Sequence, residues 1–371
     1  MTDIEQLCDI IQLISTDGIG AVTFFNLLHK TGNIKSALEA ASQKKVLYER
    51  EKAVLEVENA KRLGIKIIAY CDNEYPQSLL QLNDAPPILY ALGNIELLHH
   101  NPAIAIVGGR NASIAGRKIA SRISYDLTNN DVLVISGMAR GIDSAAHKGA
   151  LYAKNQQGST IAVLGTGVDE IYPNENTDLY HDILKQGLLI SEFPLGTKAQ
   201  IPNFPRRNRI ISALAAGTVV VEAGLHSGSL ITAKLALEQG KDIFAVPGSP
   251  MEPRSAGSNQ LIKDGALLTE CADDILNTLS IQSAYQIKKQ QINTLPLDKP
   301  QNNVNISPQK NVNTLNKDID LLNLISFEGV DIDELLRLSN LSQADFFMQI
   351  LDLEFAGKIQ RQTGNKVARI K

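Results

Sequence analysis

The stretch AIAIVGGRNASIAGRKIASRISYDL, residues 103–127, decides the fold. It begins with five apolar residues, turns at Gly108 and Gly109, and continues with apolar residues at helical spacing. An unbroken apolar run is typical of a strand that is buried on both faces, as parallel strands are. The stretch therefore predicts a strand, a tight turn and a helix, which together open a βαβ unit.

The same alternation of short apolar runs and helical patterns continues to about residue 276. We expect strands at Ala103–Val107, Val132–Ser136, Thr160–Leu164, Leu188–Ser191, Thr218–Glu222 and Asp242–Val246. Helical patterns between them include Ile114–Leu127, Ile142–Lys154 and Leu230–Gln239. The alternation predicts an α/β domain over residues 71–276, with an extended Rossmann-like, doubly wound and mostly parallel sheet.

The segments on either side of this domain have a different character. Residues 1–70 are helical in pattern, and Gly18-Ile19-Gly20 between two short helices is typical of a SAM-like or helix-hairpin-helix domain, although a plain helix-to-helix turn explains it as well. Residues 277–316 are rich in Asn, Gln and Lys and predict a flexible linker. Residues 317–371 predict three short helices and a terminal hairpin, which is the pattern of a winged-helix domain. The basic hairpin of that domain either binds DNA or is a solvated edge.

Composition narrows the classes of function. The net charge is only −4, so a polyanionic partner must meet a local basic cluster rather than a general field. The widely spaced Cys8, Cys71 and Cys271 argue against a zinc site or a disulfide framework and fit a reducing cytosol. No apolar run reaches the ~18–20 residues of a membrane span. We therefore expect a cytoplasmic protein with no membrane partner, and the absence of metal-ligand and dinucleotide motifs predicts neither metal nor cofactor.

Three arginines mark the start of one predicted helix. Arg206, Arg207 and Arg209 follow Pro205, and proline is favoured in the first turn of a helix. Cations at that end meet the positive pole of the helix dipole, which is unfavourable by roughly 0.3–1 kcal/mol each. The arrangement predicts an anionic partner among the arginines, and phosphate is the best candidate.

Three glycine-containing turns come at the carboxyl ends of other predicted strands. They are Gly108-Gly109-Arg110, the loop Gly137–Gly141 and Ser227-Gly228-Ser229. Ligands of open parallel sheets bind at this edge, where helix N-termini offer amides to anions. A single glycine in such a turn is more often there for steric reasons, but the set predicts a phosphate-bearing ligand. Asp143 is interpreted as a helix N-cap and His147 as its packing partner, rather than as a catalytic pair.

At these motifs the sequence resembles the DNA-processing protein A (DprA/Smf) family. The matching stretches include AIVGGRNASIAG (105–116), VISGMARGIDSAAHKGAL (134–151), FPRRNRII (204–211) and SGSLITAKLALEQGKDIFAVPG (227–248). The resemblance covers about residues 75–274. It implies a homodimer without catalytic residues that binds single-stranded DNA, protects incoming strands and helps load the RecA recombinase in natural transformation.

The resemblance also implies which residues contact the DNA. Carried over by motif, they are Gly108, Gly109, Arg110, Ser136, Gly137, Arg140, Gly141, Phe204, Arg206, Arg207, Asn208, Arg209, Ser227, Gly228 and Ser229, with Lys198 and Lys241 as looser assignments. The family usually has Thr or Ser where this chain has Gly109, so a hydroxyl contact is missing there.

Two other functions are compatible with parts of the sequence. One is a nucleoside-monophosphate phosphoribohydrolase on a related Rossmann fold, but the nearest text to its PGGxGTxxE motif, VPGSP at 246–250, lacks both the GT and the glutamate. The other is a sequence-specific regulator acting through the winged helix. A single-strand-binding recombination mediator explains more of the motifs than either.

Overall fold

The protein is described from a computed structural model, which covers residues 2–154, 160–280, 321–325, 330–339, 341, 343–362 and 366–370. The chain divides into two compact units, Met1–Leu295 and Pro296–Lys371. Most of the predicted linker, from residue 281 to residue 316, lies outside the described residues, and the last helix of the first unit runs through residues 272–280.

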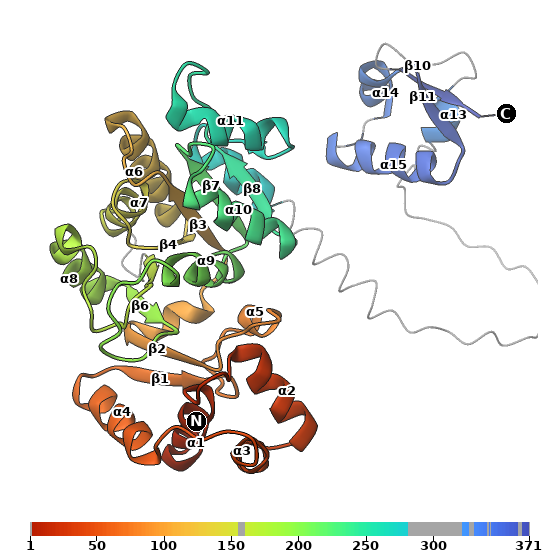
Figure 1. The fold of residues 1–371 in the computed structure, drawn as a ribbon. Helices are drawn as coiled ribbons and strands as arrows, with labels where there is room; N and C mark the ends of the chain where they lie inside the picture. The colour runs from red at the N-terminus through yellow and green to blue at the C-terminus, as the bar shows by residue number, and fades with distance from the viewer. Residues whose placement is uncertain are drawn as a thin grey trace, which may run out of the picture. The chain divides into compact units, whose positions relative to one another are not determined.

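A mostly parallel sheet forms the centre of the first unit (Figure 1). In spatial order its described strands are β1 (Lys66–Ala69), β2 (Ile88–Gly93), β6 (Leu188–Ser191), β5 (Thr160–Val163), β4 (Leu133–Ser136), β3 (Ala103–Gly108), β7 (Gly217–Val221), β8 (Asp242–Ala245) and β9 (Leu267–Leu268). The chain moves outward from β3 to β6 and then returns to the other side of β3 to begin β7. The sheet is therefore doubly wound, and its topological switch point lies between β3 and β7.

The six predicted strands are confirmed as β3 to β8, with ends that differ by one residue at most. The sequence analysis missed β1, β2 and β9. The strand β1 lies inside the segment predicted to be helical, where it pairs antiparallel with β2, which in turn pairs antiparallel with β6. The sheet thus extends beyond its parallel core at one edge.

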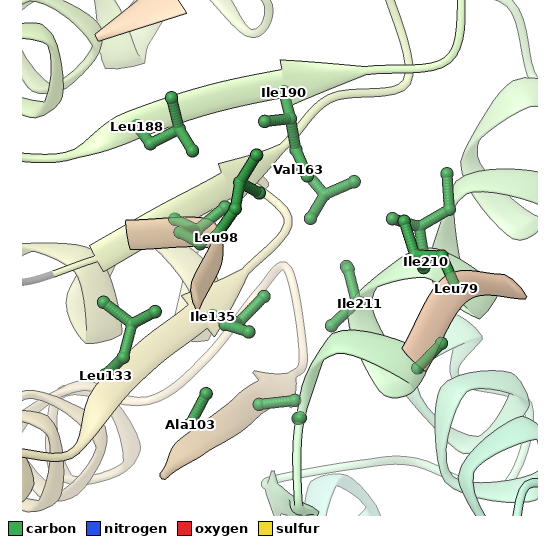
Figure 2. Close-up of a cluster of buried hydrophobic side chains, with 14 of the residues drawn as sticks. Leu79, Leu98, Ala103, Leu133, Ile135, Val163, Leu188, Ile190, Ile210 and Ile211 are labelled. Atoms are coloured by element: carbon green, nitrogen blue, oxygen red, sulfur yellow. The ribbon is translucent and has the colours of Figure 1, made fainter. Parts of the chain in front are cut away.

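Helices cover both faces of the sheet because successive strand residues point to opposite sides. Ile104, Ile106 and Val134 pack beneath α6 (Ile114–Asn129) and α7 (Ile142–Leu151). On the other face lie Ile135, Val163 and Ile190, together with Ile210 and Ile211 of α9 (Asn203–Leu214), and Figure 2 shows this cluster. The helix α10 (Gly228–Glu238) adds Ala233 and Ala236 to the same core.

Smaller elements complete the first unit. The helix α8 (Thr177–Gln186) packs on β5 and β6 through Leu179 and Ile183. The short elements are α5 (Gln77–Leu80), η1 (Ile95–His99), η2 (Asn174–Asn176), η3 (Pro253–Ser255) and α11 (Ala256–Lys263). Among the described helices, none is long and apolar enough to cross a membrane.

Four N-terminal helices gather at the antiparallel edge of the sheet, beyond β1 (Figure 1). They are α1 (Ile4–Ile14), α2 (Ala21–Thr31), α3 (Ile34–Ser42) and α4 (Arg50–Arg62). Gly18 has a φ of 70° in the turn between α1 and α2, where a left-handed backbone favours glycine. The core of these helices, with Phe24 fully buried, includes Ala69 and Tyr90 from the sheet, so the small helical domain is anchored to β1 and β2.

The second unit has the winged-helix fold predicted for it. Its described elements are α13 (Leu321–Leu324), β10 (Val330–Asp331), α14 (Ile332–Ser339), α15 (Gln343–Phe355), β11 (Ile359–Gln362) and β12 (Lys366–Arg369). The three strands form an antiparallel sheet in the order β10-β12-β11. Leu335, Phe346, Ile350 and Val367 form a core of their own. The predicted turn around Gly364-Asn365 lies outside the described residues.

Candidate nucleic-acid interface

The carboxyl edge of the parallel strands is hollowed by two adjoining cavities. They share the side chains of Arg110, Tyr172, Phe204 and Arg207. One cavity reaches the loop after β4 and the loop after β5, and the other, of about 500 Å³, reaches Ser227–Ser229 at the start of α10. We call the two together the rim groove. The turns predicted to converge at this edge are therefore brought together by the sheet.

An arginine and two aromatic rings are stacked in the middle of the rim groove. The guanidinium carbon of Arg110 lies 5.2 Å from the centroid of the Phe204 ring, which is within cation–π range. The Tyr172 ring lies 5.4 Å from that of Phe204 at an interplanar angle of 33°. A Cβ on Gly165 would lie 2.8 Å from the Phe204 ring, so the glycine leaves room for it. The stack combines an exposed cation with aromatic faces, and such a surface suits both a phosphate and a base.

Arg207 points away from solvent, with only 4% of its surface exposed. Its Nη1 donates to the carbonyl oxygen of Gly137 at 2.7 Å and also to that of Val163. Burial lowers the pKa of Arg207 to about 10, so the guanidinium stays charged at neutral pH, and Asp143 opposes this shift. Arg207 lines the groove wall, but its Nη1 donates to backbone carbonyls at the ends of β4 and β5.

Asp143 lies behind the loop Gly137–Gly141 and holds it. Its Oδ2 accepts hydrogen bonds from the amides of Gly137 at 3.2 Å and Ala139 at 3.4 Å. Burial raises the pKa of Asp143 to about 6, with Arg207 as the main opposing charge. The N-cap of α7 is Gly141, with a φ of 81°, so the predicted N-cap role of Asp143 is corrected: its carboxylate braces the loop from within the first turn.

His147 supports the same loop one turn later. Its Nε2 accepts from the amide of Met138 at 3.3 Å, and its Nδ1 lies 2.7 Å from the Thr160 hydroxyl. That hydroxyl donates to the carbonyl of Val134, so Nδ1 carries the proton and the ring is neutral. Burial lowers the pKa of His147 to about 3. The backbone amides of Gly137, Met138 and Ala139 thus donate to side chains inside the protein. The Arg140 side chain is the part of the loop that faces solvent.

The other two arginines of α9 have carboxylate partners inside the protein. Arg209 is buried and donates to Asp84 at 2.7 Å and to both oxygens of Glu192 at 2.9 Å. Arg206 is half exposed and lies 3.0 Å from Glu192, with its guanidinium 5.3 Å from the Phe193 ring centroid. Part of the anionic charge predicted around these arginines is therefore the protein's own.

Several predicted contact residues lie elsewhere. The Ser136 hydroxyl donates to the carbonyl of Ile106 at 2.6 Å in the sheet interior, so Ser136 cannot reach a ligand. Lys241 precedes β8 and lines a different cavity with Ala103 and Leu133, at the amino ends of the strands. Lys198 is exposed and pairs with Glu170 at 2.5 Å. The sheet separates Lys241 from the rim groove.

The glycines of the rim groove are required mainly by close packing. A Cβ on Gly108 would overlap the carbonyl oxygen of Val221, and one on Gly141 would overlap that of Gly109. A Cβ on Gly137 would meet the Arg207 guanidinium. Gly228 differs because nothing lies within 4 Å of its Cβ position.

The start of α10 is built as predicted, with a serine on either side of Gly228. Ser227 is the N-cap, and its hydroxyl lies 2.7 Å from that of Ser229. The side-chain amide of Asn208 donates to the carbonyl of Gly228 at 3.5 Å, which links α9 to this turn. The two hydroxyls and Asn208 form the far end of the rim groove.

One supporting residue at the switch point was not identified from the sequence. Glu222, with a φ of 49°, accepts from the Ser113 amide at 2.7 Å and from the Ser113 hydroxyl. Its carbonyl accepts from the Gly109 amide at 2.7 Å. It thereby ties the turn after β3 to the start of α6. The sequence feature that could have identified Glu222 is an acidic residue at the end of an apolar strand, β7, which pairs with the strand that carries Gly108.

The sequence was compared with models of known families and with curated proteins. A family model described as DNA recombination-mediator protein A matches residues 66–280. Models described as the DprA winged helix domain and the DprA-like N-terminal HHH domain match residues 309–365 and 4–44. Protein Smf of Escherichia coli (strain K12) is 38% identical over 294 residues, 79% of this chain and 74% of that protein. The DNA processing protein DprA of Bacillus subtilis (strain 168) is 41% identical over 216 residues, 58% and 72% of the two chains.

Solved structures show the same likeness. DNA processing protein A from Streptococcus pneumoniae aligns with a TM-score of 0.59 at 33% identity, over 74% of this chain and 93% of its own. The protein of the same name from Helicobacter pylori, described by its single-stranded DNA binding mode, aligns with a TM-score of 0.53 at 28% identity. That alignment covers 59% of this chain and 96% of the other.

Proposed function

The chain belongs to the DNA recombination-mediator protein A family, and we propose that it binds single-stranded DNA along the rim groove. The observation that carries this proposal is the continuity of the groove past Arg110, Phe204 and Ser227–Ser229. Cations and hydroxyls suit phosphates. The exposed Tyr172 ring beside the half-buried Phe204 suits unpaired bases, each of which gains about 1–3 kcal/mol by stacking on an aromatic ring.

The proposed binding is led by the DNA backbone. Arg110, Arg140 and Arg206 supply the charge, and Asn208 with the Ser227 and Ser229 hydroxyls supplies further donors. Arg207 and Arg209 support this surface from below rather than contacting the strand. We propose no catalytic role for Asp143, which lines the groove, or for His147 behind it, because both brace the loop after β4.

The wider role follows from family membership. A recombination mediator of this family is proposed to protect incoming single strands and to help load the RecA recombinase onto them in natural transformation. We propose that it acts as a cytoplasmic homodimer. We propose that its functional domains are residues 1–70, 71–276, 277–316 and 317–371, as the sequence suggests. The strand β1 lies within the first range but belongs to the sheet.

The test is an anisotropy titration of a labelled single strand and of its duplex across salt concentrations. We expect salt-sensitive binding that favours the single strand, since phosphate contacts release counterions. Replacing the exposed Arg110 by Ala should lower the affinity and reduce the salt slope by about 0.7 per lost contact. An unchanged slope in Arg110→Ala, or equal affinity for the duplex, would contradict the proposed site.

A further inference from the structure

Two exposed cations are paired with glutamates: Arg140, which lines the rim groove, and Lys198, which is outside the groove lining. Arg140, which ends the loop after β4, lies 3.4 Å from Glu175, and Lys198 lies 2.5 Å from Glu170. Both glutamates come from the segment between β5 and α8, in which Glu170 belongs to the loop and Glu175 to η2. The same loop carries Tyr172 into the stack with Phe204.

The segment that carries these glutamates is held in place by its own contacts. The carboxylate of Asp169 accepts from the Gly196 amide at 2.9 Å, and the Thr166 hydroxyl donates to the carbonyl of Glu170 at 3.1 Å. At the far end of the segment the side-chain amide of Asn176 donates to the carbonyl of Met138 at 2.8 Å. The glutamates are therefore presented to the cations by a fixed segment, whereas Glu192, which pairs with Arg206, is buried against Arg209 and belongs to the core.

On the basis of the proposed function, we propose that Glu170 and Glu175 are affinity-determining residues that occupy the positions of phosphates in the DNA-free protein. A phosphate that approaches Arg140, or Lys198, meets a carboxylate already within ion-pair distance of the same cation, and the two negative charges repel each other. The two glutamates therefore weaken binding and favour release of the strand. Arg110 stacks on Phe204 and forms no ion pair within the described part of the chain, so it is left as the first cation available to DNA.

The test replaces Glu175 by Gln, which keeps the size of the side chain and removes its charge. Glu175→Gln should bind a single strand about threefold to tenfold more tightly at low salt, and its salt slope should steepen by about 0.7, because one more cation is free to meet a phosphate. Glu170→Gln should act in the same direction through Lys198. A gain in affinity cannot arise from a variant that simply fails to fold.

A matched control separates local release from a change in net charge. Glu238 forms an exposed pair with Lys234 at 3.9 Å near the end of α10, away from the groove, and its side chain is 58% exposed against 63% for Glu175. Glu238→Gln should leave the affinity unchanged. In an Arg140→Ala background the gain from Glu175→Gln should vanish, because no cation is left to release.

Two results would overturn the inference. If Glu175→Gln binds less tightly than the wild type, the glutamate holds Arg140 ready for DNA. If Glu238→Gln gains as much as Glu175→Gln, the effect belongs to net charge. Either result can occur while Arg110→Ala still lowers the affinity and the salt slope, so failure here is distinguishable from failure of the proposed single-strand site.

Discussion

Replacing Arg207 by Ala should lower the free energy of unfolding strongly, whereas its direct effect on the groove surface should be small. The side chain is buried, it donates to the carbonyls of Gly137 and Val163, and it is the main charge opposite Asp143. Truncation leaves these carbonyls without their donor and leaves a buried carboxylate uncompensated. Each buried acceptor left without its donor costs about 1–3 kcal/mol, and the lost charge near Asp143 adds to this, so we expect a total loss of about 3–5 kcal/mol.

Urea unfolding of the full chain measures this cost. With a slope of about 1–3 kcal/mol per molar urea, a loss of about 3–5 kcal/mol should lower the midpoint by about 1–5 M. Arg110→Ala is the matched control, because Arg110 is exposed and its loss should change stability by no more than about 0.5 kcal/mol while lowering DNA affinity. The reasoning would be refuted by an Arg207→Ala protein that unfolds at the wild-type midpoint and has lost DNA binding. That result would place Arg207 on the DNA, as the family motif suggested.

Two further predictions concern the same groove. The pKa of Asp143 is raised to about 6 from an ordinary value of 3.8, so the ionised carboxylate is less favourable in the folded than in the unfolded state. Above pH 6 this lowers the free energy of unfolding by at most about 3 kcal/mol. The loss disappears as the pH falls from about 6 to about 4, because the carboxyl group becomes protonated. The unfolding free energy of the wild type should rise over that range relative to Asp143→Asn, and parallel pH profiles of the two would contradict the assignment. Phe204→Ala should weaken binding of an ordinary oligonucleotide by about 1–3 kcal/mol but hardly affect an abasic strand of equal length. Equal losses on both strands in a competition titration would show that the ring does not stack on bases.

Much of the fold could be predicted because the parallel strands are visible as separate apolar runs. Most residues of β3 to β8 are buried on both faces, so these strands are mainly apolar runs and stand out from the helices beside them. The strands β1 and β9 offer no such signal. KIIA at β1 is four residues long and pairs antiparallel at an edge, and β9 is only two residues long with both leucines exposed. Nothing local in such segments requires a partner strand.

The convergence of the groove loops could be predicted, but the direction of each side chain could not be assigned from motifs alone. Arg207 comes three and four residues before Ile210 and Ile211, so helical spacing already places it on the buried face of α9. Lys241 comes before a strand rather than after it, which places it at the opposite edge of a parallel sheet. Both signals were present in the sequence. The pairing of Arg140 with Glu175 was not, because it depends on how two loops lie in space.

The antiparallel edge of the sheet limits how this protein can be divided. The strand β2 has its outer side covered by β1, through the register Lys66↔Ala91 to Ala69↔Ile88, and β1 continues directly from the N-terminal helices. A fragment that begins at residue 75 would leave β2 as a bare edge and uncover Tyr90, which invites pairing between molecules. If the N-terminal helices are exchanged between proteins, in evolution or in the laboratory, residues 66–69 therefore have to stay with the sheet that they complete.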